Sequence, residues 1–508
     1  MAGIFKKLRD RVFGRNPAPE AEASTPSLVT LPPLQKEKSS GTKNDGRRSS
    51  SPEYFVQIGL DFGTAFSKCV CRDVMTGSKA WVHRRPKDKC ISGLPFLIPS
   101  VVHYQNGVFT HQPGYGTEYS KHGLPHVKMA LEKVSLSQWD DPVLEPFRRA
   151  AGSNLSDHDL VEFIEASAVY LLAGIIGEVK AAIPSYFPAG FVEGRVAVNM
   201  AVPVSNADHP DVENTFQRVL CQAWVIANEL QGFPSISITD LKQKISATKG
   251  QACSSETNGA CYIYPEVSAN VQAFVRSRTS REGIYLFSDT GAGTVDQSLF
   301  IFTRNSGESE RSEKLTYLYA AVLPLGSSHL ERLAAEHAGT NDWKSLESYR
   351  KMKEQSKRDV HLCYAVSVVR SELSDSTQKT IYQAKQKLQR RQQIDDLRIL
   401  FGGGGHITDP YAEAVEAQFS GRYFNPITIN MRRSKGESFA VGMPDPQDLE
   451  LAASERKWMK RLTVAYGLSF EKSELSPFKL PKAVSDPKPE DLWQPKREFV
   501  AAPSKDVC

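Results

Sequence analysis

Two segments of the sequence share one layout that strongly limits how the chain can fold. Residues 58–73 read IGLDFGTAFSKCVCRD, and residues 284–302 read IYLFSDTGAGTVDQSLFIF. In each, an apolar run typical of a strand ends in an aspartate, passes through a Gly-Thr turn and continues as a second strand. Glycine lets the backbone approach a ligand closely, and the N–H groups of the turn can donate to phosphate oxygens. Two such hairpins about 230 residues apart predict two facing lobes that bind one polyphosphate.

A third segment, residues 397–415, reads LRILFGGGGHITDPYAEAV. It predicts a strand, a run of glycines and then a helix that begins near a proline. The glycines would let a planar base or a ribose lie against the backbone. His406 follows them and is expected to be an ordinary loop histidine. The sequence contains neither a Walker A motif nor G-x-G-x-x-G, so it does not support a P-loop or a Rossmann site.

The rest of the pattern indicates an α/β fold, because β-branched and apolar runs alternate with helical patterns from Tyr54 onward. The expected strands are residues 54–60, 66–72, 195–202, 284–289, 296–303 and 397–401. The expected helices are residues 157–181, 210–229, 266–277, 327–337, 380–395 and 452–466. A chain of 508 residues suits two large lobes better than one small core.

The charge of the chain is concentrated near its start. Residues 1–52 contain ten Lys or Arg and five Asp or Glu, and this excess accounts for the whole net charge of +5. The remainder is neutral, so we expect no nucleic-acid-binding surface across the folded body. Residues 15–52 are rich in Pro, Ser, Lys and Arg and are expected to be disordered.

The first residues offer a different possibility. Apolar side chains in residues 4–13 recur at helical spacing, with basic side chains largely on the other face. This predicts a short amphipathic helix that binds an anionic membrane weakly, docks in a partner's groove or packs on the protein itself. The alternative is a frayed terminus. The start of the chain lacks the features of a signal peptide, and no run of 18 apolar residues predicts a membrane span. A cytoplasmic protein, peripheral to the membrane if that helix binds it, is therefore expected.

The eight cysteines are scattered and include no C-x-x-C pair. They therefore predict no zinc site or disulfide framework, and they agree with a reducing compartment. Cys69 and Cys71 lie two residues apart on a predicted strand, and we expect both to be small core residues.

Taken in order, these segments resemble the superfamily of actin, the DnaK-type heat-shock ATPases and the sugar kinases. IGLDFGTAFSKCV resembles its phosphate-1 motif, SDTGAGTVDQSLF its phosphate-2 motif and LFGGGGHITDP its adenosine motif. VAVNMAVPVSNADHP at 196–210 is similar to the strand and Val-Pro segment of DnaK-type ATPases. YPEVSANVQAFV at 264–275 and VAYGLSF at 464–470 resemble the two connecting helices.

The resemblance spans residues 54–470 and implies a two-lobed actin-like ATPase fold, with duplicated ribonuclease-H-like domains and inserted subdomains. It places lobe I, with phosphate-1 and the first connecting helix, at residues 53–277. Lobe II, with phosphate-2, the adenosine motif and the second connecting helix, would cover residues 278–470. Residues 1–52 and 471–508 would be tails.

The same resemblance assigns roles to individual residues, with ATP and Mg²⁺ as cofactors. Asp61 and Asp289 would hold the metal through water, Asp289 also serving in catalysis. Glu266 would position the attacking water, and Lys128, in HVKMALE, would match the catalytic lysine of the chaperones. The other cofactor contacts would come from the glycine segments: Gly63, Thr64, Gly291, Gly293, Thr294, Gly402, Gly403 and Gly404.

Simpler roles stay open for several of these residues. Asp61 and Asp289 could merely cap their turns. Glu266 could be a helix-initiating acid favoured by the helix dipole, and Lys128 an ordinary surface lysine. The basic run at 385–393 is expected to be a solvated helix face.

The sequence also departs from the family. Ala292 replaces a common glycine of phosphate-2. DnaK-type chaperones continue into a β-rich peptide-binding domain, for which residues 471–508 are too few. Their Pro- and Lys-rich composition instead predicts an extended tail.

Three functions follow from the resemblance. The first is a DnaK-like slow Mg-dependent ATPase, a chaperone-like switch whose nucleotide state is read by a protein partner bound to its tails or lobe surfaces. The second is an actin-like, filament-forming cytoskeletal ATPase, which the amphipathic segment at residues 4–13 would attach to a membrane. The third is a small-molecule kinase.

Overall fold

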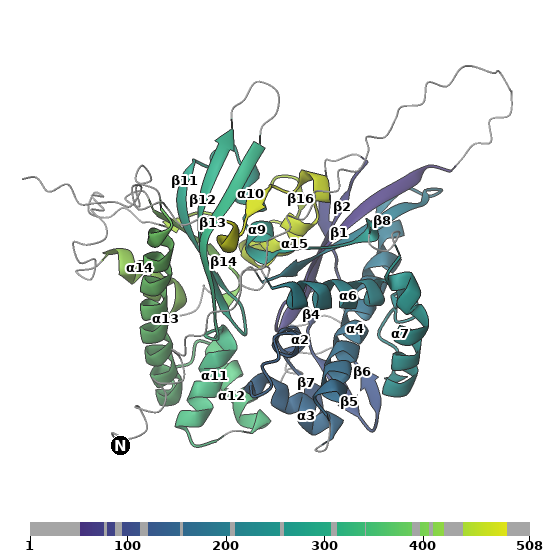
Figure 1. The fold of residues 1–508 in the computed structure, drawn as a ribbon, viewed down its shortest axis with the longest axis horizontal. Helices are drawn as coiled ribbons and strands as arrows, with labels where there is room; N and C mark the ends of the chain where they lie inside the picture. Colours follow the sequence, from purple (N-terminus) through teal and green to yellow (C-terminus); the bar gives the residue numbers. More distant parts are fainter. Residues whose placement is uncertain are drawn as a thin grey trace, which may run out of the picture. The chain divides into compact units, whose positions relative to one another are not determined.

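A computed structural model gives the fold of most of the chain (Figure 1). The described residues are 51–75, 79–86, 94–111, 120–152, 156–203, 209–254, 259–305, 312–340, 342–388, 397–405, 410–420 and 440–484. The predicted amphipathic helix at 4–13 and His406 lie outside them. The chain is a mixed α/β protein, as the sequence predicts, and its strands form several sheets.

The first sheet has the strand order β10-β8-β1-β2-β3-β16, with β4 paired to β2. Its strands are β1 Glu53–Asp61, β2 Phe66–Asp73, β3 Ala80–Val82, β4 Ile98–Pro99, β8 Val192–Val202, β10 Cys261–Pro265 and β16 Leu449–Glu450. β1 pairs antiparallel with β2 and parallel with β8. Helices pack against β1, β8 and β10, so β1 is buried along nearly its whole length, as its continuous apolar sequence requires.

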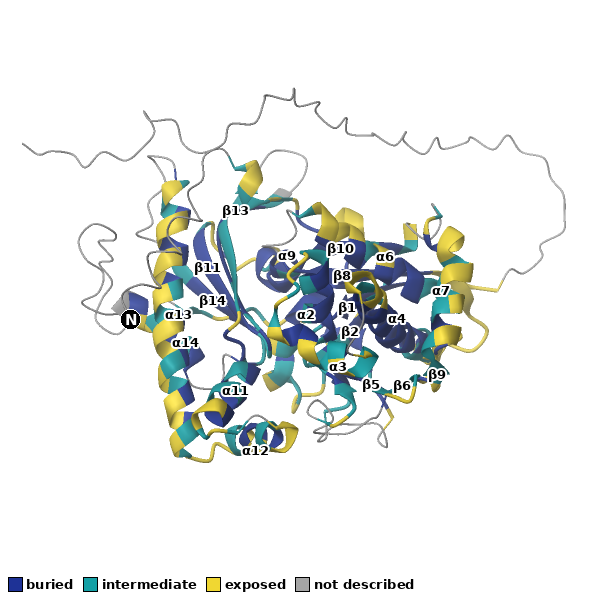
Figure 2. Cartoon of the chain, turned by 60° about the horizontal axis from the view of Figure 1, so that its bottom comes forward, coloured by how far each residue is buried: buried dark blue, intermediate teal, exposed yellow. Residues whose placement is uncertain are grey.

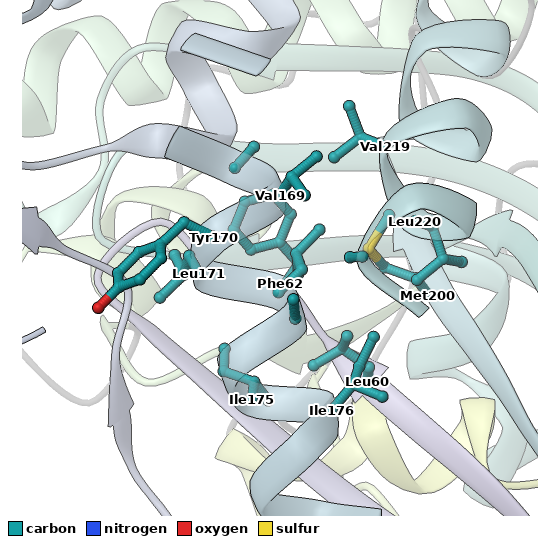
Figure 3. Packing of buried hydrophobic residues seen from close by; sticks show 14 of the residues in the cluster. Leu60, Phe62, Val169, Tyr170, Leu171, Ile175, Ile176, Met200, Val219 and Leu220 are labelled. Carbon is teal, nitrogen blue, oxygen red and sulfur yellow. The ribbon is translucent and has the colours of Figure 1, made fainter. Parts of the chain in front are cut away.

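Helices from the same part of the chain complete this core. They are α2 Val127–Ser135, α3 Glu145–Ala151, α4 Asp157–Ala182, α6 Pro210–Ile226 and α7 Ile238–Ala252, with short 3₁₀ turns at Pro142–Leu144 and Ile183–Tyr186. A capping box between Ser156 and Asp159 begins α4, which satisfies its first N–H groups. Figure 3 shows Val169 and Ile176 of α4 packed near Leu60 and Phe62 of the first hairpin.

The long helix α4 is apolar enough to resemble a membrane span. Together with the 3₁₀ turn that follows it, it has a mean hydropathy of 1.8 in its most apolar window, but 83% of that window is buried in the protein. Figure 2 shows this helix dark blue, in the interior. Its apolar side chains therefore meet the protein's own core, which is the pattern of a core helix.

A small sheet with the strand order β7-β5-β6-β9 packs against the same hydrophobic core as α4. Its strands are β5 Val102–Gln105, β6 Val108–Thr110, β7 Gly123–Leu124 and β9 Ile236–Ser237. Phe109 of β6 stacks on Tyr170 of α4 with ring centroids 5.7 Å apart. The small sheet is thus tied to the first core by aromatic contacts.

The second sheet has the order β15-β14-β11-β12-β13-β17. Its strands are β11 Gly283–Thr290, β12 Val295–Asn305, β13 Ser312–Leu323, β14 Arg398–Gly402, β15 Ala440–Val441 and β17 Phe478–Lys479. The helices of this part are α11 Ser327–His337, α12 Trp343–Glu354, α13 Val360–Gln386 and α14 Tyr411–Ser420. α13 packs against β12 and β13, and Figure 2 shows its outward side exposed.

Short helices connect the two sheets: α9 Glu266–Asn270, α10 Gln272–Arg276 and α15 Thr463–Leu468, the last preceded by a 3₁₀ helix at Arg456–Arg461. α15 lies against β1 and α9, and this close packing depends on glycine. A Cβ atom at Gly467 would lie 1.9 Å from the carbonyl oxygen of Ala269, and one at Gly59 would lie 2.1 Å from that of Ala465. The backbones could not approach so closely with any side chain at these positions.

The six predicted strands are all present, but three predicted helices differ. The helix expected at 266–277 is broken at Val271 into α9 and α10. The one expected at 380–395 is the end of the much longer α13, which begins at Val360; residues 389–396 lie outside the described part. The one expected at 452–466 is a 3₁₀ turn followed by the short α15. The sequence reading also missed β13, because its mixed polar and apolar residues gave no clear alternation.

Residues 471–484 are folded, although the sequence predicts an extended tail there. β17 pairs with β13, the hydroxyl of Tyr264 donates to Ser476 O at 2.8 Å, and 3₁₀ turns form at Lys472–Glu474 and Pro481–Ala483. Residues 471–484 therefore pack on the body. The predicted boundary between lobes at residue 278 is also too simple, because β16, at Leu449–Glu450, pairs with β3 in the first sheet.

Candidate functional site

The two Asp-Gly hairpins have the same register. In β1–β2, Asp61 lies opposite Lys68, and in β11–β12, Asp289 lies opposite Asp296. In both, the residue opposite the aspartate comes seven positions later, so the two turns enclose loops of equal length. Both hairpins were predicted from the sequence, and both are present in the structure. Each also pairs with a further strand on its other edges: β8 and β3 for the first hairpin, and β14 and β13 for the second.

The tips of the two hairpins lie next to each other. A Cβ atom at Gly293 would lie 2.9 Å from Cγ2 of Thr64 and 2.2 Å from Sδ of Met129, which is on α2. The start of α11 packs against the second tip, and there Ser328 N donates to Ala292 O at 2.8 Å. Thr64 and Thr294 are both half-buried, and Thr64 lies directly against Gly293 of the second tip.

The glycine segment after β14 joins the second hairpin. β14 runs parallel to β11, and Gly402 is the register partner of Asp289. Gly403 has φ +77°, and a Cβ atom there would lie 2.2 Å from Asp289 Oδ1. A Cβ atom at Gly404 would lie 2.9 Å from Arg461 Nε. These glycines thus follow the carboxyl end of a parallel strand, which is where α/β proteins commonly bind ligands.

Lys128 and Glu266 form an ion pair that joins α2 to α9. Lys128 Nζ donates to Glu266 Oε2 at 2.5 Å, and both side chains are largely buried. Burial opposes the charged form of Lys128, but the carboxylates of Glu266 and Asp61 outweigh it and raise the pKa of the lysine. Lys128 is therefore a buried cation rather than the surface lysine that the sequence left open.

The two predicted metal-binding acids have different partners. Lys68 Nζ donates to Asp61 Oδ2 at 2.5 Å, whereas Asp289 Oδ2 accepts from the neutral amide of Asn270, also at 2.5 Å. Burial, followed by the charges of Glu266 and Asp61, raises the pKa of Asp289 to about 7. Asp289 therefore holds a proton more tightly than an exposed aspartate does.

Asp296 adds a further carboxylate to this group. Its pKa is raised well above the ordinary value by burial and by the neighbouring charges of Glu266 and Asp289. Its Oδ1 atom is buried and has no hydrogen-bond partner among the described residues. A buried acceptor without a donor usually has a role that the protein alone does not fulfil, such as holding a water or an ion.

All twelve predicted site residues lie in the described part of the chain. The carboxylates of Asp61, Glu266 and Asp289 are close enough to alter the same pKa, and the glycines of all three segments border them. Lys68, Asn270 and Asp296 belong to the same group and were not predicted from the sequence. The signal for Lys68 and Asp296 was available, because each lies seven residues after its aspartate and must face it in a hairpin of this length.

A second group of potential metal ligands is found elsewhere, on the first turns of α4. His158, Asp159 and Glu162 bring ligand atoms within 4.8 Å of one another, but all three are exposed. Asp159 accepts from Ser156 in the capping box, and Glu162 accepts from Lys242 Nζ at 2.7 Å. These contacts account for the group as a helix cap and a surface ion pair.

Comparison with models of known protein families finds no match to this sequence. A search of curated proteins likewise finds no match.

Proposed function

We propose that this chain is a DnaK-like ATP-binding protein with a two-lobed actin-like fold. It would be a slow Mg-dependent ATPase that acts as a nucleotide-controlled, chaperone-like switch. The observation that carries the proposal is the meeting of two matched Asp-Gly hairpins, tip to tip, beside a third glycine segment. Opposed backbone donors of this kind suit a polyphosphate, which presents acceptor oxygens on several sides.

The matched register of the hairpins supports the fold. Each hairpin lies in the interior of its sheet, and its first strand also has a parallel neighbour: β8 beside β1, and β14 beside β11. A duplicated domain would produce this repeated arrangement. The helices α9 and α15, which connect the two sheets, pack against each other, and this contact supports their proposed role as a pair of connecting helices.

The residues present suit a divalent cation. Mg²⁺ prefers oxygen ligands, and the site offers the carboxylates of Asp61 and Asp289 with the unsatisfied Oδ1 of Asp296. The cluster of acids also raises the pKa of Asp289, and a bound cation would relieve that repulsion. When bound, Mg²⁺ would neutralise part of the phosphate charge. Asp61 and Asp289 would hold it, directly or through water.

The protein's own groups supply positioning. Lys128 fixes the carboxylate of Glu266 through its 2.5 Å hydrogen bond, and Lys68 fixes that of Asp61 in the same way. Glu266 would accept a hydrogen bond from the attacking water and orient it, while the N–H groups of Thr64 and Gly293 would donate to phosphate oxygens. The N–H groups of Gly63 and Gly291 instead donate to Asp61 O and Thr294 O and shape the two turns. Phosphoryl transfer depends mainly on such positioning and charge stabilisation.

Titration calorimetry with ATP tests the proposal. We expect one ATP to bind per chain in the presence of Mg²⁺ and affinity to fall at least tenfold without it, a loss of about 1.4 kcal/mol or more. Asp289→Asn should weaken binding and slow hydrolysis. Asp211→Asn is a matched control, because that carboxylate is 75% exposed on α6 and should leave both unchanged. Absence of binding heat with Mg²⁺ present would overturn the proposal.

Switching and the alternative functions need separate measurements. A switch predicts different limited-proteolysis patterns with ATP and with ADP, because nucleotide state would alter how the hairpins are held. An actin-like protein would instead pellet as filaments on addition of ATP, and a kinase would transfer phosphate to a member of a metabolite panel. A protein partner that reads the nucleotide state would bind one nucleotide form in preference to the other.

A further inference from the structure

Two cysteines far apart in the sequence meet between α6 and β10. Cys221 lies on α6 and Cys261 begins β10, and both are buried and reduced. The two residues are direct neighbours, because the amide nitrogen of Gln217 lies 3.2 Å from Cys221 Sγ and 3.1 Å from the carbonyl oxygen of Cys261, and the two thiols interact with each other. A contact between two thiols from different elements brings together the two atoms that a disulfide would join.

A polar side chain holds the pair in place. Gln217, one turn before Cys221 on α6, donates its amide to Cys221 Sγ at 3.2 Å and to the carbonyl oxygen of Cys261 at 3.1 Å. The one amide group therefore fixes both the sulfur of one cysteine and the backbone of the other. A donor aimed at sulfur also favours the thiolate, which is the reactive form.

The surroundings favour ionisation of one thiol of the pair. The hydrogen bond from Cys261 and the amide of Gln217 lower the pKa of Cys221 to about 7, against the effect of burial. The hydrogen bond with Cys221 and burial raise the pKa of Cys261, while the nearby cation of Lys180 acts in the opposite direction. Cys221 is thus the nucleophile, and Cys261 is the thiol placed to resolve its oxidised form.

We infer that Cys221 and Cys261 form a redox-active dithiol that peroxide converts to an intramolecular disulfide tying α6 to β10. The Cys221 thiolate attacks one peroxide oxygen, the O–O bond breaks, and the sulfur becomes a sulfenic acid. The hydroxide that leaves takes up the proton that the Cys221 thiol has lost and becomes water. The sulfur of Cys261 then attacks the sulfur of Cys221; the S–S bond forms, the S–O bond breaks, and the hydroxide leaves as water with the proton of Cys261. The two thiols lose two electrons and two protons in total, and the peroxide is reduced to two water molecules.

The consequence follows from where β10 leads. β10 is the edge strand of the first sheet, and it ends at Pro265, directly before Glu266 at the start of α9. A disulfide at the other end of β10 would anchor this strand to α6 and close a loop of about 40 residues. Closing a loop of that length restricts the unfolded chain. The inference does not depend on nucleotide binding.

A second cysteine pair provides a matched control. Cys69 and Cys71 are also buried, but they lie two residues apart on β2. Residues so spaced on one strand have Cα atoms about 6.6 Å apart, at the upper limit for a disulfide. Burial raises the pKa of both thiols. This pair should stay reduced under the same treatment.

Peptide mapping of the full chain without reduction tests the inference. After treatment with hydrogen peroxide and alkylation, we expect a linked peptide containing Cys221 and Cys261 that disappears on reduction, with Cys69 and Cys71 alkylated. The melting temperature should rise by several degrees on oxidation and fall again on reduction. Cys261→Ser should abolish the link and leave a dimedone-reactive sulfenic acid on Cys221.

Two further measurements guard against a variant that fails to fold. Gln217→Leu should slow formation of the link several-fold without preventing it, and phenylarsine oxide, a probe of paired thiols, should bind the untreated protein in one copy. The inference is overturned if Cys221 and Cys261 remain fully alkylated while the exposed Cys253 and Cys363 oxidise. It is equally overturned if the linked peptide joins either of them to another cysteine instead.

Discussion

The β1–β2 and β11–β12 hairpins share a register and a loop length, yet they surround their aspartates with opposite charges. The residue facing Asp61 is Lys68, and the residue facing Asp289 is Asp296. Asp61 therefore has a cation at 2.5 Å, whereas among the described residues Asp289 accepts from the amide of Asn270 and lies among other acids. The two hairpins therefore have the same backbone register but place their aspartates in different electrostatic environments.

This difference suggests that the two hairpins contribute differently to stability and to ligand binding. The first has an internal counter-ion, so its aspartate is compensated before any ligand binds. The second concentrates negative charge that the described residues do not fully compensate, and a divalent cation would compensate it. Burying uncompensated charge costs stability, so we expect the second hairpin to lower the stability of the ligand-free protein. The following changes test this contrast, and we expect their effects to decrease in the order given.

The largest effect should come from the glycine that touches Asp289. Gly403→Ala would force a side chain onto a residue with φ +77° and place Cβ 2.3 Å from Thr290 O. Strain and overlap with backbone should together cost about 5 kcal/mol or prevent folding. The matched change Gly291→Ala places Cβ 3.4 Å from its nearest neighbour, Thr294 O, and should cost less than about 1 kcal/mol. Urea unfolding of both variants measures this, and equal losses would contradict it.

Asp289→Asn should stabilise the ligand-free protein at pH 8. The pKa of Asp289 is raised to about 7, so the folded state binds this proton more tightly than the unfolded chain does. The stability due to that proton is complete below about pH 4 and is lost as the pH rises through 7. Removing the charge should therefore add up to about 4 kcal/mol at pH 8 and almost nothing at pH 4.

The same substitution in the other hairpin should have the opposite sign. Asp61→Asn removes the ion pair with Lys68 and should destabilise the protein at pH 8. Urea unfolding without metal or nucleotide, at pH 4 and pH 8, compares the two variants. If both substitutions shift stability in one direction, the hairpins do not differ as we describe.

Lys68→Met should destabilise the protein by about 2 kcal/mol, because Asp61 is only 3% exposed and would lose its cation. The methionine keeps most of the side-chain volume, so the loss reports charge rather than packing. The control is Lys79→Met, which removes an exposed pair with Glu450 and should change stability by less than about 0.5 kcal/mol. Thermal unfolding is sufficient to separate the two outcomes.

Asp296→Asn should have the smallest effect on stability, within about 1 kcal/mol. Burial and the neighbouring acids raise the pKa of Asp296, which favours its neutral form, and a neutral amide is a close substitute for that form. Affinity for MgATP should nevertheless fall about tenfold, because the bound cation would use the ionised form. A large loss of stability with unchanged affinity would assign Asp296 a structural role instead.

The sequence revealed the backbone of the site better than its charges. The strands around Asp61, Asp289 and Gly402 were predictable because an apolar run ending at a glycine turn has few alternatives. The partners of Asp289 were not, since Asn270 comes from α9 and is brought in by the close crossing at Gly467. Such a contact depends on tertiary packing, which no local pattern encodes.

Residues 471–484 are a second case in which the sequence pattern did not predict tertiary packing. Residues 471–484 have the composition of a tail, yet β17 adds to the second sheet and Ser476 accepts from Tyr264. Proline and lysine can border a packed edge strand as well as an extended linker. Composition alone could not separate the two, because the deciding factor is the exposed edge of β13, which the sequence reading had missed.

The most direct test of the central claim measures MgATP affinity when one hairpin at a time loses a hydroxyl group. Thr64→Val and Thr294→Val change one atom group each, at two tips that approach each other near Gly293. We predict a single binding site per chain in calorimetry, with each variant weakening it about tenfold or more. Full affinity in either variant, or a stoichiometry of two, would show that the two hairpins do not hold the same triphosphate.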